Sequence, residues 1–465
     1  MKHKIIISDG GSFRILFDSK IDAEKFREYL YEFYRRELGT TITIAEPVEV
    51  KSEQDAIRQA QVNLRRAKHR DKPPVSIEQT PYTAICASCG VRIARYYESR
   101  FPDEEENYVC EVCERKSEAR EHVKENFLRK FLSFVSVGMT QGYDFPKKDA
   151  DEVANLDPRN YIAYIIADGN NMGKIFGSCN NFDQLRKLSE NLDTIINESL
   201  AEPTKVLLGK QRRHLQEREE GSVLIPVLPL ILGGDDVFAL LPARWSLDFT
   251  LRFSMEFEKR MKNFLTQIGL SDVSPTISAA VVICKGKFPY LVAHEIGEEL
   301  LKTAKKRAKE EKSSTISFTV LTGSEIVKVP KEKRIFVAGF PAYTINELKK
   351  LIEYRFILKN LPGTRRAQFE SLFLRAEELD SNEKEAFRLM KEEWIPERQS
   401  ILNRLDKKLR NAVGRALVDL GNPQNDGNWL LIGGSYFHQF PDLLRVWDFA
   451  YNLERDVSEY EEVER

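Results

Sequence analysis

The order of apolar strands and amphipathic helices between residues 160 and 322 restricts the fold more than any other feature. A buried strand, NYIAYIIA, is followed by an amphipathic helix that begins near Phe182. The strands SVLIPVLPLIL and VFALLPA, joined through Gly233–Asp236, come next, and then a helix and the strand TISAAVVI. This β-α-β-β-α-β order is that of the ferredoxin-like fold. A helix from Pro289 to about Lys309 and the strand STISFTVLTG extend it.

The flanking segments show other patterns. KIIISDGGSFRILF predicts a hairpin with a D-G-G turn, followed by a helix that ends at Gly39 and a strand over TITIAEPVEV. A basic helix is expected from Ser52 to Arg70. Beyond residue 340 the pattern is helical to about Leu420, opened by the capping box TINE, and FPDLLRVWDFAYNLE predicts a last helix.

Two CxxC pairs form the most specific motif of the chain. Cys86 and Cys89 are separated from Cys110 and Cys113 by twenty residues, a spacing that suits one tetrahedral zinc ion. The alternatives are four free cysteines or a redox pair. A closed four-cysteine site leaves no open position for substrate, so this zinc is expected to be structural. Cys179 and Cys284 lie near predicted strands and are interpreted as ordinary small residues.

Asp235 and Asp236 stand between apolar runs, where unpaired carboxylates are costly to bury. In the predicted fold, the end of the first strand lies beside the tip of the following hairpin. Asp168 would therefore join these two aspartates. Three converging carboxylates repel one another unless divalent cations neutralise them, and Mg²⁺ or Mn²⁺ shared with substrate phosphates is the expected partner.

The residues around these aspartates favour a nucleotide. A glycine-containing turn could cradle a triphosphate with its backbone N–H groups; it comprises Gly169, Asn170, Asn171, Met172 and Gly173. Gly233 and Gly234 would let a nucleotide lie close to the hairpin. Lys302, Lys305 and Lys309 could share one helix face and reach phosphates. Each pattern alone is common in exposed turns and solvated helices, but their matching places favour a metal–nucleotide site.

Charge and hydropathy limit the possible partners. The formal net charge is −1, so nucleic-acid contact would require local basic patches such as Arg58–Arg70. The chain shows no signal-peptide pattern and no apolar run of membrane-spanning length. We therefore expect a cytoplasmic protein without membrane contact.

Several motifs resemble the second palm domain of the large subunit of type III CRISPR effector complexes (the Cas10 family). They are LGGDDVFALLP, ADGNNMGKIFG, TISAAVVICKGKFPYLVAHEIGEELLKTAKK and STISFTVLTGSE. The resemblance covers most of the chain and is most specific in residues 160–325. It implies an α+β fold with four domains: a reduced N-terminal palm-like domain (1–75), a zinc-binding module with a connecting helix (76–150), a GGDD catalytic palm (151–330) and a helical, thumb-like C-terminal domain (331–465).

The same resemblance implies a cyclase that converts ATP into 3′–5′ cyclic oligoadenylates in antiviral defence, triggered by target RNA within a complex that carries guide RNA. Asp168, Asp235 and Asp236 would hold the catalytic metals, and Ser278 would lie near the nucleotide. The chain departs from the family at Asn170, where an acid is frequent, and at Ala280, where glycine is frequent.

The chain also contains no His-Asp dipeptide, so a short form without the HD nuclease domain, and without nuclease activity, is expected. Two other interpretations stay open: a non-catalytic, RNA-binding scaffold subunit, and a GGDEF-like cyclase that makes a guanine dinucleotide.

Overall fold

The computed structural model describes residues 3–9, 12–38, 40–70, 83–98, 106–135, 143–145, 150–211, 223–322, 334–379, 382–422 and 428–461. The chain forms two compact units. The first consists of Met1–Phe134 and Met172–Asn191, and the second of Val135–Asn171 and Leu192–Arg465. The domain boundaries expected near residues 75, 150 and 330 stay predictions.

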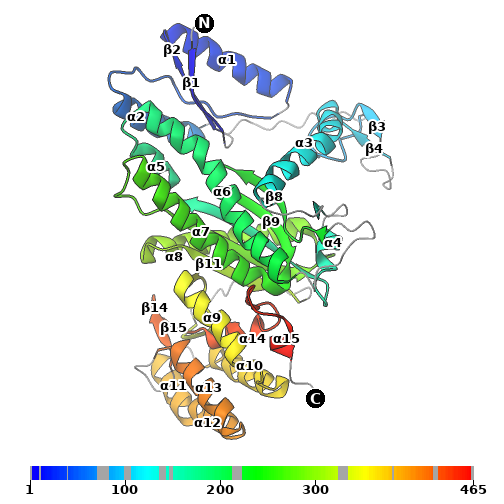
Figure 1. The fold of residues 1–465 in the computed structure, drawn as a ribbon, viewed down its shortest axis with the longest axis vertical. Coiled ribbons are helices and arrows are strands. Elements are labelled where there is room, and N and C mark those ends of the chain that lie inside the picture. Colours follow the sequence, from blue (N-terminus) through cyan, green and yellow to red (C-terminus); the bar gives the residue numbers. More distant parts are fainter. Residues whose placement is uncertain are drawn as a thin grey trace. The chain divides into compact units, whose positions relative to one another are not determined.

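A six-stranded sheet forms the centre of the second unit, with the order β13-β11-β10-β6-β9-β8 (Figure 1). The strands are β6 (Tyr161–Asn170), β8 (Leu228–Gly233), β9 (Asp236–Pro242), β10 (Thr276–Lys285), β11 (Thr315–Val320) and β13 (Tyr343–Thr344). The four strands β10-β6-β9-β8 are, in chain order, the fourth, first, third and second. This is the ferredoxin-like arrangement, so the predicted α+β palm fold is confirmed. Strand β11 pairs parallel with β10.

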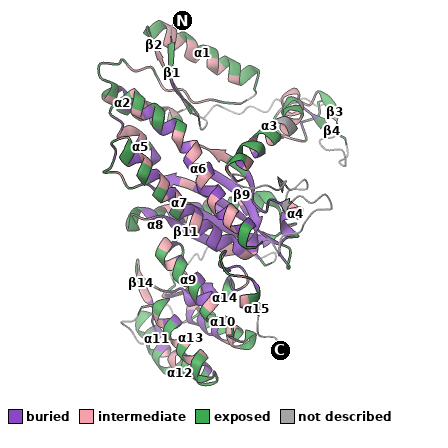
Figure 2. Ribbon diagram, in the orientation of Figure 1, coloured by how far each residue is buried: buried purple, intermediate pink, exposed green. Residues whose placement is uncertain are grey.

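Three long helices accompany this sheet: α6 (Phe182–Lys210), α7 (Ser246–Gln267) and α8 (Tyr290–Glu311). Strands β6, β9 and β10 are almost entirely buried, whereas β8 is partly exposed (Figure 2). Helix α8 packs on the face that carries Ile166 and Val282, and a Cβ built on Gly297 would lie 2.4 Å from Cδ1 of Ile166. A glycine is needed there because interiors packed at crystal-like density leave no room for an added methyl group.

The C-terminal third is mainly helical, as predicted. Its helices are α9 (Ile345–Ile357), α10 (Gly363–Glu377), α11 (Glu383–Leu389), α12 (Ile395–Asn403), α13 (Lys407–Asp419), α14 (Phe440–Arg445) and α15 (Ser458–Glu461). A small sheet joins β12 (Phe336–Ala338), β15 (Ser435–His438) and β14 (Leu430–Ile432). Thr344 and Glu347 form the predicted capping box at the start of α9. The ion pair between Arg307 and Glu347, at 2.7 Å, joins α8 to α9.

The prediction of a last helix over residues 440–454 is wrong, because α14 ends at Arg445. The backbone beyond it bonds to the palm instead of continuing the helical ladder. The N–H of Tyr451 donates to the carbonyl of Arg244 at 3.2 Å. The N–H of Leu453 donates to the buried carboxylate of Asp248 at 2.8 Å. These tertiary bonds satisfy groups that a longer helix would have bonded internally.

The first unit contains smaller elements. They are β1 (His3–Asp9), β2 (Ser12–Phe17), α1 (Lys20–Arg36), α2 (Glu53–Arg70), β3 (Tyr96–Glu98), β4 (Asn107–Val109), α3 (Glu111–Val135) and α5 (Met172–Gly177). Strands β1 and β2 form the predicted hairpin, whose Gly10 and Gly11 lie outside the described residues. Short elements of the second unit are α4 (Ala150–Ala154) and the parallel pair of β5 (Tyr143–Asp144) and β7 (Val223–Leu224).

The predicted strand over residues 41–50 is wrong, since no ladder forms there. A side chain replaces a partner strand at its centre. The hydroxyl of Tyr31 donates to the carbonyl of Ile44 at 3.2 Å and accepts from its N–H at 3.3 Å. Alternation of apolar and polar residues is therefore not sufficient here, and the segment forms no strand.

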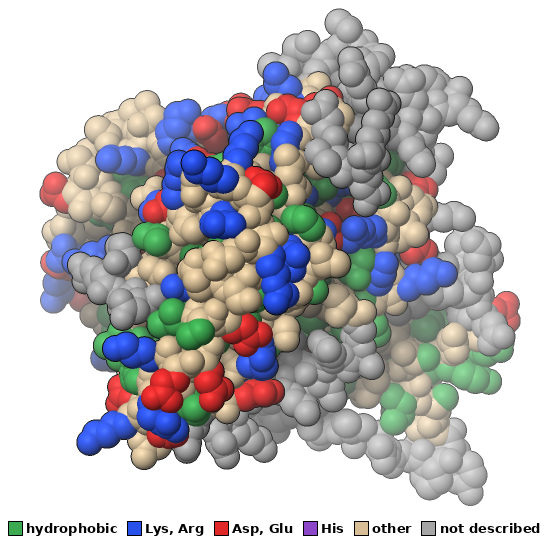
Figure 3. All heavy atoms as spheres, turned by 90° about the horizontal axis from the view of Figure 1, so that it is seen from below, with side chains coloured by type: hydrophobic (Ala, Val, Ile, Leu, Met, Phe, Trp, Pro, Cys, Tyr) green, Lys and Arg blue, Asp and Glu red, His purple; other side chains and the backbone are tan. Residues whose placement is uncertain are grey.

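Basic and acidic side chains are interspersed on the face of the molecule drawn in Figure 3. This mixture agrees with the formal net charge of −1. Within the described residues, no helix combines the length and the apolar character that crossing a membrane requires.

Candidate nucleotide and metal sites

The three predicted aspartates lie at one edge of the palm sheet. Ala167 pairs with Val237 across β6 and β9, which puts Asp168 beside the start of β9 at Asp236. Gly234 and Asp235 form the two-residue turn between the paired Gly233 and Asp236. Gly234 has φ = 64°, a left-handed conformation that side-chain-bearing residues rarely adopt and that hairpin turns require. Backbone geometry thus requires a glycine at Gly234. It does not require one at Gly233, where an added Cβ would meet nothing within 4 Å.

The turn concentrates negative charge. Partial burial and the charges of Asp168 and Asp236 raise the pKa of Asp235 to about 7. Loss of hydration and the carboxylate of Asp168, to which Asp236 is hydrogen-bonded, raise the pKa of Asp236 to about 6. Asp235 and Asp236 therefore resist full ionisation at neutral pH, and a cation bound at the cluster would favour their charged forms.

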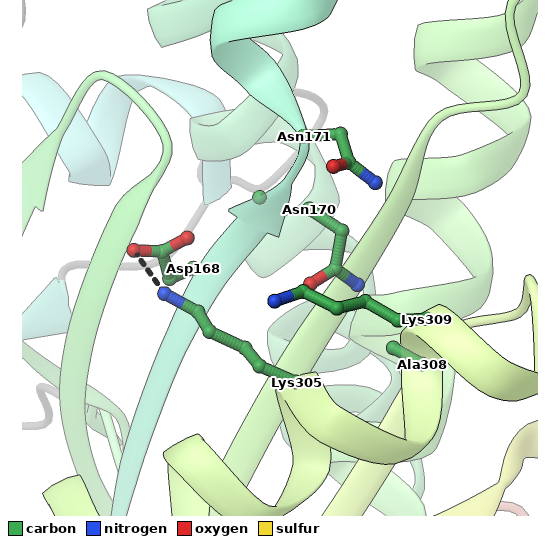
Figure 4. Close-up of a pocket in the computed structure, with 7 residues that line it drawn as sticks. Asp168, Asn170, Asn171, Lys305, Ala308 and Lys309 are labelled. Carbon is green, nitrogen blue, oxygen red and sulfur yellow. Dashed lines mark ion pairs between the residues drawn. The ribbon is translucent and has the colours of Figure 1, made fainter. Parts of the chain in front are cut away.

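Lysines of α8 supply part of that positive charge. Lys305 forms an ion pair with Asp168, with Nζ 2.7 Å from Oδ2 (Figure 4). Lys309, one turn further along, lines the same cavity as Lys305. Lys302 does not line it, since Lys302 pairs with Glu299 at 2.6 Å and keeps 67% of its side chain exposed. The structure thus places Lys302 outside the lining of this cavity, and a contribution of Lys302 to phosphate binding stays a prediction.

The cavity has a volume of about 120 Å³ and is lined by Asp168, Gly169, Asn170, Asn171, Lys305, Ala308 and Lys309. Sites for drug-sized ligands usually measure roughly 300–1,000 Å³. The cavity therefore offers room for a phosphate group, whereas the rest of a nucleotide would have to lie on the open surface beside it.

The predicted five-residue turn is shorter in the structure. Gly169 and Asn170 belong to β6, because they pair with Ile277 and Thr276 of β10. Asn171, with φ = 58°, makes the turn alone. Met172 and Gly173 begin α5 in the first compact unit and do not line the cavity. Strand pairing thus extended the sheet by two residues at the expense of the loop.

Asn170 is held by β10. Its amide nitrogen donates to the hydroxyl of Thr276 at 3.1 Å, and its oxygen accepts from the hydroxyl of Ser278 at 2.9 Å. Ser278 is fully buried and pairs across strands with Asp168. Ser278 does not line the cavity itself, but its hydroxyl holds Asn170, which does. Ala280, two residues further, is also fully buried in the sheet.

Two residues absent from the predicted list belong to this environment. Thr276 anchors the Asn170 amide, and the charge of Glu298 contributes to raising the pKa of Asp236. Glu298 lies seven residues before Lys305 on α8, a spacing of about two helical turns. That periodicity was the available signal in the sequence.

The metal-binding potential of the two predicted sites differs. In the four-cysteine cluster, the sulfur atoms all lie within 4.8 Å of one another, close enough to bind one metal ion. Among the described residues, no other group of three or more His, Cys, Asp or Glu side chains lies this close together. The aspartate cluster does not meet this spacing. Its donor set is nevertheless the one that Mg²⁺ prefers, namely carboxylates with open positions for substrate phosphates.

Cys86, Cys89, Cys110 and Cys113 converge as the sequence predicts. Gly90, with φ = 66°, closes the first knuckle, and its N–H donates to the carbonyl of Cys86 at 2.9 Å. Cys86 and Cys110 are buried together with Val109. Four cysteine sulfurs this close together are the ligand set of a tetrahedral structural zinc site, so the cluster fits a bound zinc ion.

The protonation of the thiols supports that fit. Burial opposes ionisation of Cys86, but backbone hydrogen bonds around Cys89 and Cys110 lower the pKa of Cys86 to about 6. Burial and neighbouring thiols raise the pKa of Cys110 to about 12, and burial also raises the pKa of Cys113. Without a cation only part of the cluster can ionise, whereas zinc ligation requires thiolates.

Known proteins match the region that carries the aspartates. Residues 161–315 match the family model for the second palm domain of Cas10/Cmr2. The chain is 26% identical over 220 residues to the CRISPR system Cmr subunit Cmr2 of Pyrococcus furiosus, over 45% of this chain and 24% of that protein. In structure it resembles Csm1 from the crystal structure of a Csm1–Csm4 cassette in complex with cA4, with a TM-score of 0.51 and 14% identity.

That structural likeness covers 97% of this chain and 62% of the crystallised one, and at this identity it concerns the fold alone. The chain thus spans a quarter of the matched Cmr2 and less than two thirds of the matched Csm1. These matches support the sequence resemblance to the large subunit of type III CRISPR complexes, and residues 161–315 are similar to the second palm domain of Cas10/Cmr2.

Proposed function

We propose that this protein is a metal-dependent nucleotidyltransferase that converts ATP into cyclic oligoadenylates as part of a type III CRISPR complex, in response to target RNA paired with guide RNA. The observation that carries the proposal is the convergence of Asp168, Asp235 and Asp236 beside Lys305 on a Cas10/Cmr2 palm sheet. In the reaction, the 3′-hydroxyl of one ATP attacks the α-phosphate of another. A 3′–5′ phosphodiester bond forms and pyrophosphate leaves.

The three carboxylates would hold Mg²⁺ or Mn²⁺, which neutralises phosphate charge and lowers the pKa of the attacking hydroxyl. Asp168 would have to release Lys305 before its carboxylate can ligate a cation. The freed ammonium group, together with Lys309, is then available to phosphates of the substrate at the edge of the cavity. Asn170 and Ser278 would keep the end of β6 fixed against β10 while this exchange takes place.

The cysteine cluster has a separate role in this proposal. Zinc held by Cys86, Cys89, Cys110 and Cys113 would be fully ligated by protein, so it would stabilise the module and take no part in nucleotidyl transfer.

The decisive experiment compares ATP turnover by the wild-type chain and by the double variant Asp235→Asn, Asp236→Asn. Each is incubated with Mg²⁺ or Mn²⁺, first alone and then in its assembled complex with guide and target RNA. The products are identified by liquid chromatography and mass spectrometry. We expect cyclic oligoadenylates from the wild type and at least about a hundredfold less from the double variant.

Other outcomes identify the alternatives. No ATP turnover by the wild type in any of these states would favour a non-catalytic scaffold. Dinucleotide formation from GTP and not from ATP would favour a GGDEF-like cyclase. Cyclic oligoadenylates at equal rates from both proteins would place the active site elsewhere.

A further inference from the structure

The zinc module, here the cysteine cluster with β3 and β4, carries an exposed aromatic pair that lies outside its buried core. Tyr97 of β3 and Tyr108 of β4 are cross-strand partners, with ring centroids 4.8 Å apart, and each side chain is 55% exposed. The neighbouring pair of Tyr96 and Val109 lies on the opposite face, where Val109 is buried against Cys86 and Cys110. Side chains alternate between the faces of a strand, so Tyr97 and Tyr108 face away from the cysteine core.

A basic groove lies beside this pair. It has a volume of about 630 Å³ and is lined by Arg36, Glu37, Val91, Arg92, Ile93, Arg95, Cys110, Glu111, Val112 and Arg115. Four arginines face two glutamates there, which leaves a net charge of about +2. Arg95 lines the groove and lies two residues before Tyr97 in the chain. The groove and the aromatic pair are therefore neighbours along the chain, and together they are called the Tyr–Arg surface here.

The arginines remain accessible to a ligand. Arg95 keeps 71% of its side chain exposed and has a loose contact with Glu111, at 3.5 Å. Arg115 is paired with both Glu111 and Glu37. Arg92 has no ion-pair partner within the part of the chain that the structure describes. Exposed ion pairs of this kind are worth about 0–1 kcal/mol, so a phosphate group can displace them.

We propose that the Tyr–Arg surface binds single-stranded nucleic acid, with bases stacked on Tyr97 and Tyr108 and phosphates held by Arg92 and Arg95. Aromatic rings next to a positively charged groove are the combination that sequence-tolerant binding of single strands requires. Duplexes cannot use the rings, because their bases are already stacked inside the helix. This binding is independent of the proposed nucleotidyl transfer, since neither the aspartates nor ATP takes part in it.

Fluorescence anisotropy with a labelled 12-nucleotide RNA of mixed sequence tests the proposal on the full zinc-loaded chain. The double variant Tyr97→Leu, Tyr108→Leu keeps the apolar bulk of the hairpin and removes the aromatic faces. We expect it to weaken binding by about tenfold or more, as loss of base stacking does. The matched variant Tyr97→Phe, Tyr108→Phe keeps the rings and should bind within about twofold of the wild type.

The charge arm uses Arg92→Gln, Arg95→Gln. We expect weaker binding and a smaller salt dependence, with the slope of log K against log salt reduced by about 0.7 for each lost phosphate contact. The control Arg129→Gln, Lys130→Gln removes two exposed charges from α3, about 21 Å along the helix from Arg115. It should leave the affinity and the slope unchanged. Zinc content and circular dichroism establish that each variant is folded.

Ultraviolet crosslinking of the wild type to the same RNA provides a test without substitutions, and crosslinks to Tyr97 or Tyr108 are expected. Parallel titrations with single-stranded DNA and duplex RNA of equal length identify the class of ligand; both single strands should bind more tightly than the duplex. The proposal is overturned if the wild type does not bind single strands, if the Arg129 and Arg92 pairs have equal effects, or if an acidic peptide competes as well as RNA.

Discussion

The cysteine cluster and the aspartate cluster are both groups of metal-ligand side chains, but they differ in closure. The four sulfur ligands already lie within 4.8 Å of one another in a small buried core. The aspartates are more widely spaced, and one of them, Asp168, forms an ion pair with Lys305. A closed set with no free position suits a structural ion, whereas an open set whose charge is balanced by a displaceable lysine suits ions that arrive with a substrate.

The largest effect is expected at the closed site. Cys86→Ser with Cys110→Ser should abolish zinc binding and unfold the β3–β4 module, since structural zinc contributes about 10–16 kcal/mol of apparent binding energy in zinc-finger peptides. Atomic absorption should fall from one zinc per chain to none, and the amides of residues 106–109 should lose protection from hydrogen exchange. Cys179→Ala, outside the cluster, should retain the zinc; equal zinc content in both proteins would contradict the assignment.

The open site should respond in the opposite sense. Asp235→Asn with Asp236→Asn should reduce nucleotidyl transfer by about 10²–10³-fold, the usual scale for removing electrostatic stabilisation of a transition state. The same substitutions should raise the thermal midpoint of the metal-free protein, because they remove carboxylates that repel one another. Calorimetry and the ATP assay measure the two effects. A lower midpoint would mean that the carboxylates stabilise the metal-free fold.

The sign of the pH dependence follows from the raised pKa of Asp235. The group binds its proton up to about pH 7 when folded, but only to about pH 3.8 when unfolded. The metal-free protein should therefore lose about 1–3 kcal/mol of stability as the pH rises from 4 to 7, after allowance for solvent screening. Denaturant titrations of the wild type and of Asp235→Asn should diverge over this range. Parallel curves would show that the carboxylates do not interact.

Lys305 should matter less than the aspartates. Lys305→Met removes the charge that balances Asp168 and is available to phosphates, so we expect about tenfold weaker ATP binding and a stability loss of at most about 1 kcal/mol. Isothermal titration with a non-hydrolysable ATP analogue measures the affinity. Lys302→Met is the matched control on the same helix and should bind normally; equal losses would indicate a general effect of charge.

The smallest effect is expected from Asn170→Asp. A carboxylate can accept from the hydroxyls of both Thr276 and Ser278, so the end of β6 should stay in place and turnover should change by less than about threefold. Metal titrations of ATP turnover measure this. A large gain in metal affinity would show that residue 170 turns towards the aspartates, in contrast to its orientation on β10.

Hydrophobic periodicity was sufficient to predict the order of strands in the sheet, and motif spacing was sufficient to predict both clusters of ligand residues. The ferredoxin-like order follows from strands and helices that alternate with clear periods, and the CxxC spacing defines the cysteine cluster without further information. The resemblance of the palm to the Cas10/Cmr2 second palm domain was visible in the motifs along its strands, and the family model matches the same residues, 161–315.

What could not be predicted depended on tertiary partners. The turn after Asp168 is short because β10 pairs with Gly169 and Asn170, and no local pattern reports a partner about a hundred residues away. Lys302 and Lys305 have the same periodicity, but Glu299 neutralises one and Asp168 the other. Likewise, the segment around Ile44 pairs with no strand among the described residues, and its backbone bonds to the hydroxyl of Tyr31 instead.

The path of the chain between the two compact units has a consequence for how the protein can be divided. It leaves the palm unit after Asn171 and re-enters it at Leu192, so β6 and most of α6 are linked by a segment that belongs to the other unit. Within that unit, the N–H of Phe182 donates to Glu53 at 2.7 Å and the amide of Gln54 donates to Asn180 at 2.6 Å. No single cut separates an intact palm from the rest. Gene fusion and exchange of modules between relatives should therefore preserve residues 1–191 and the palm together.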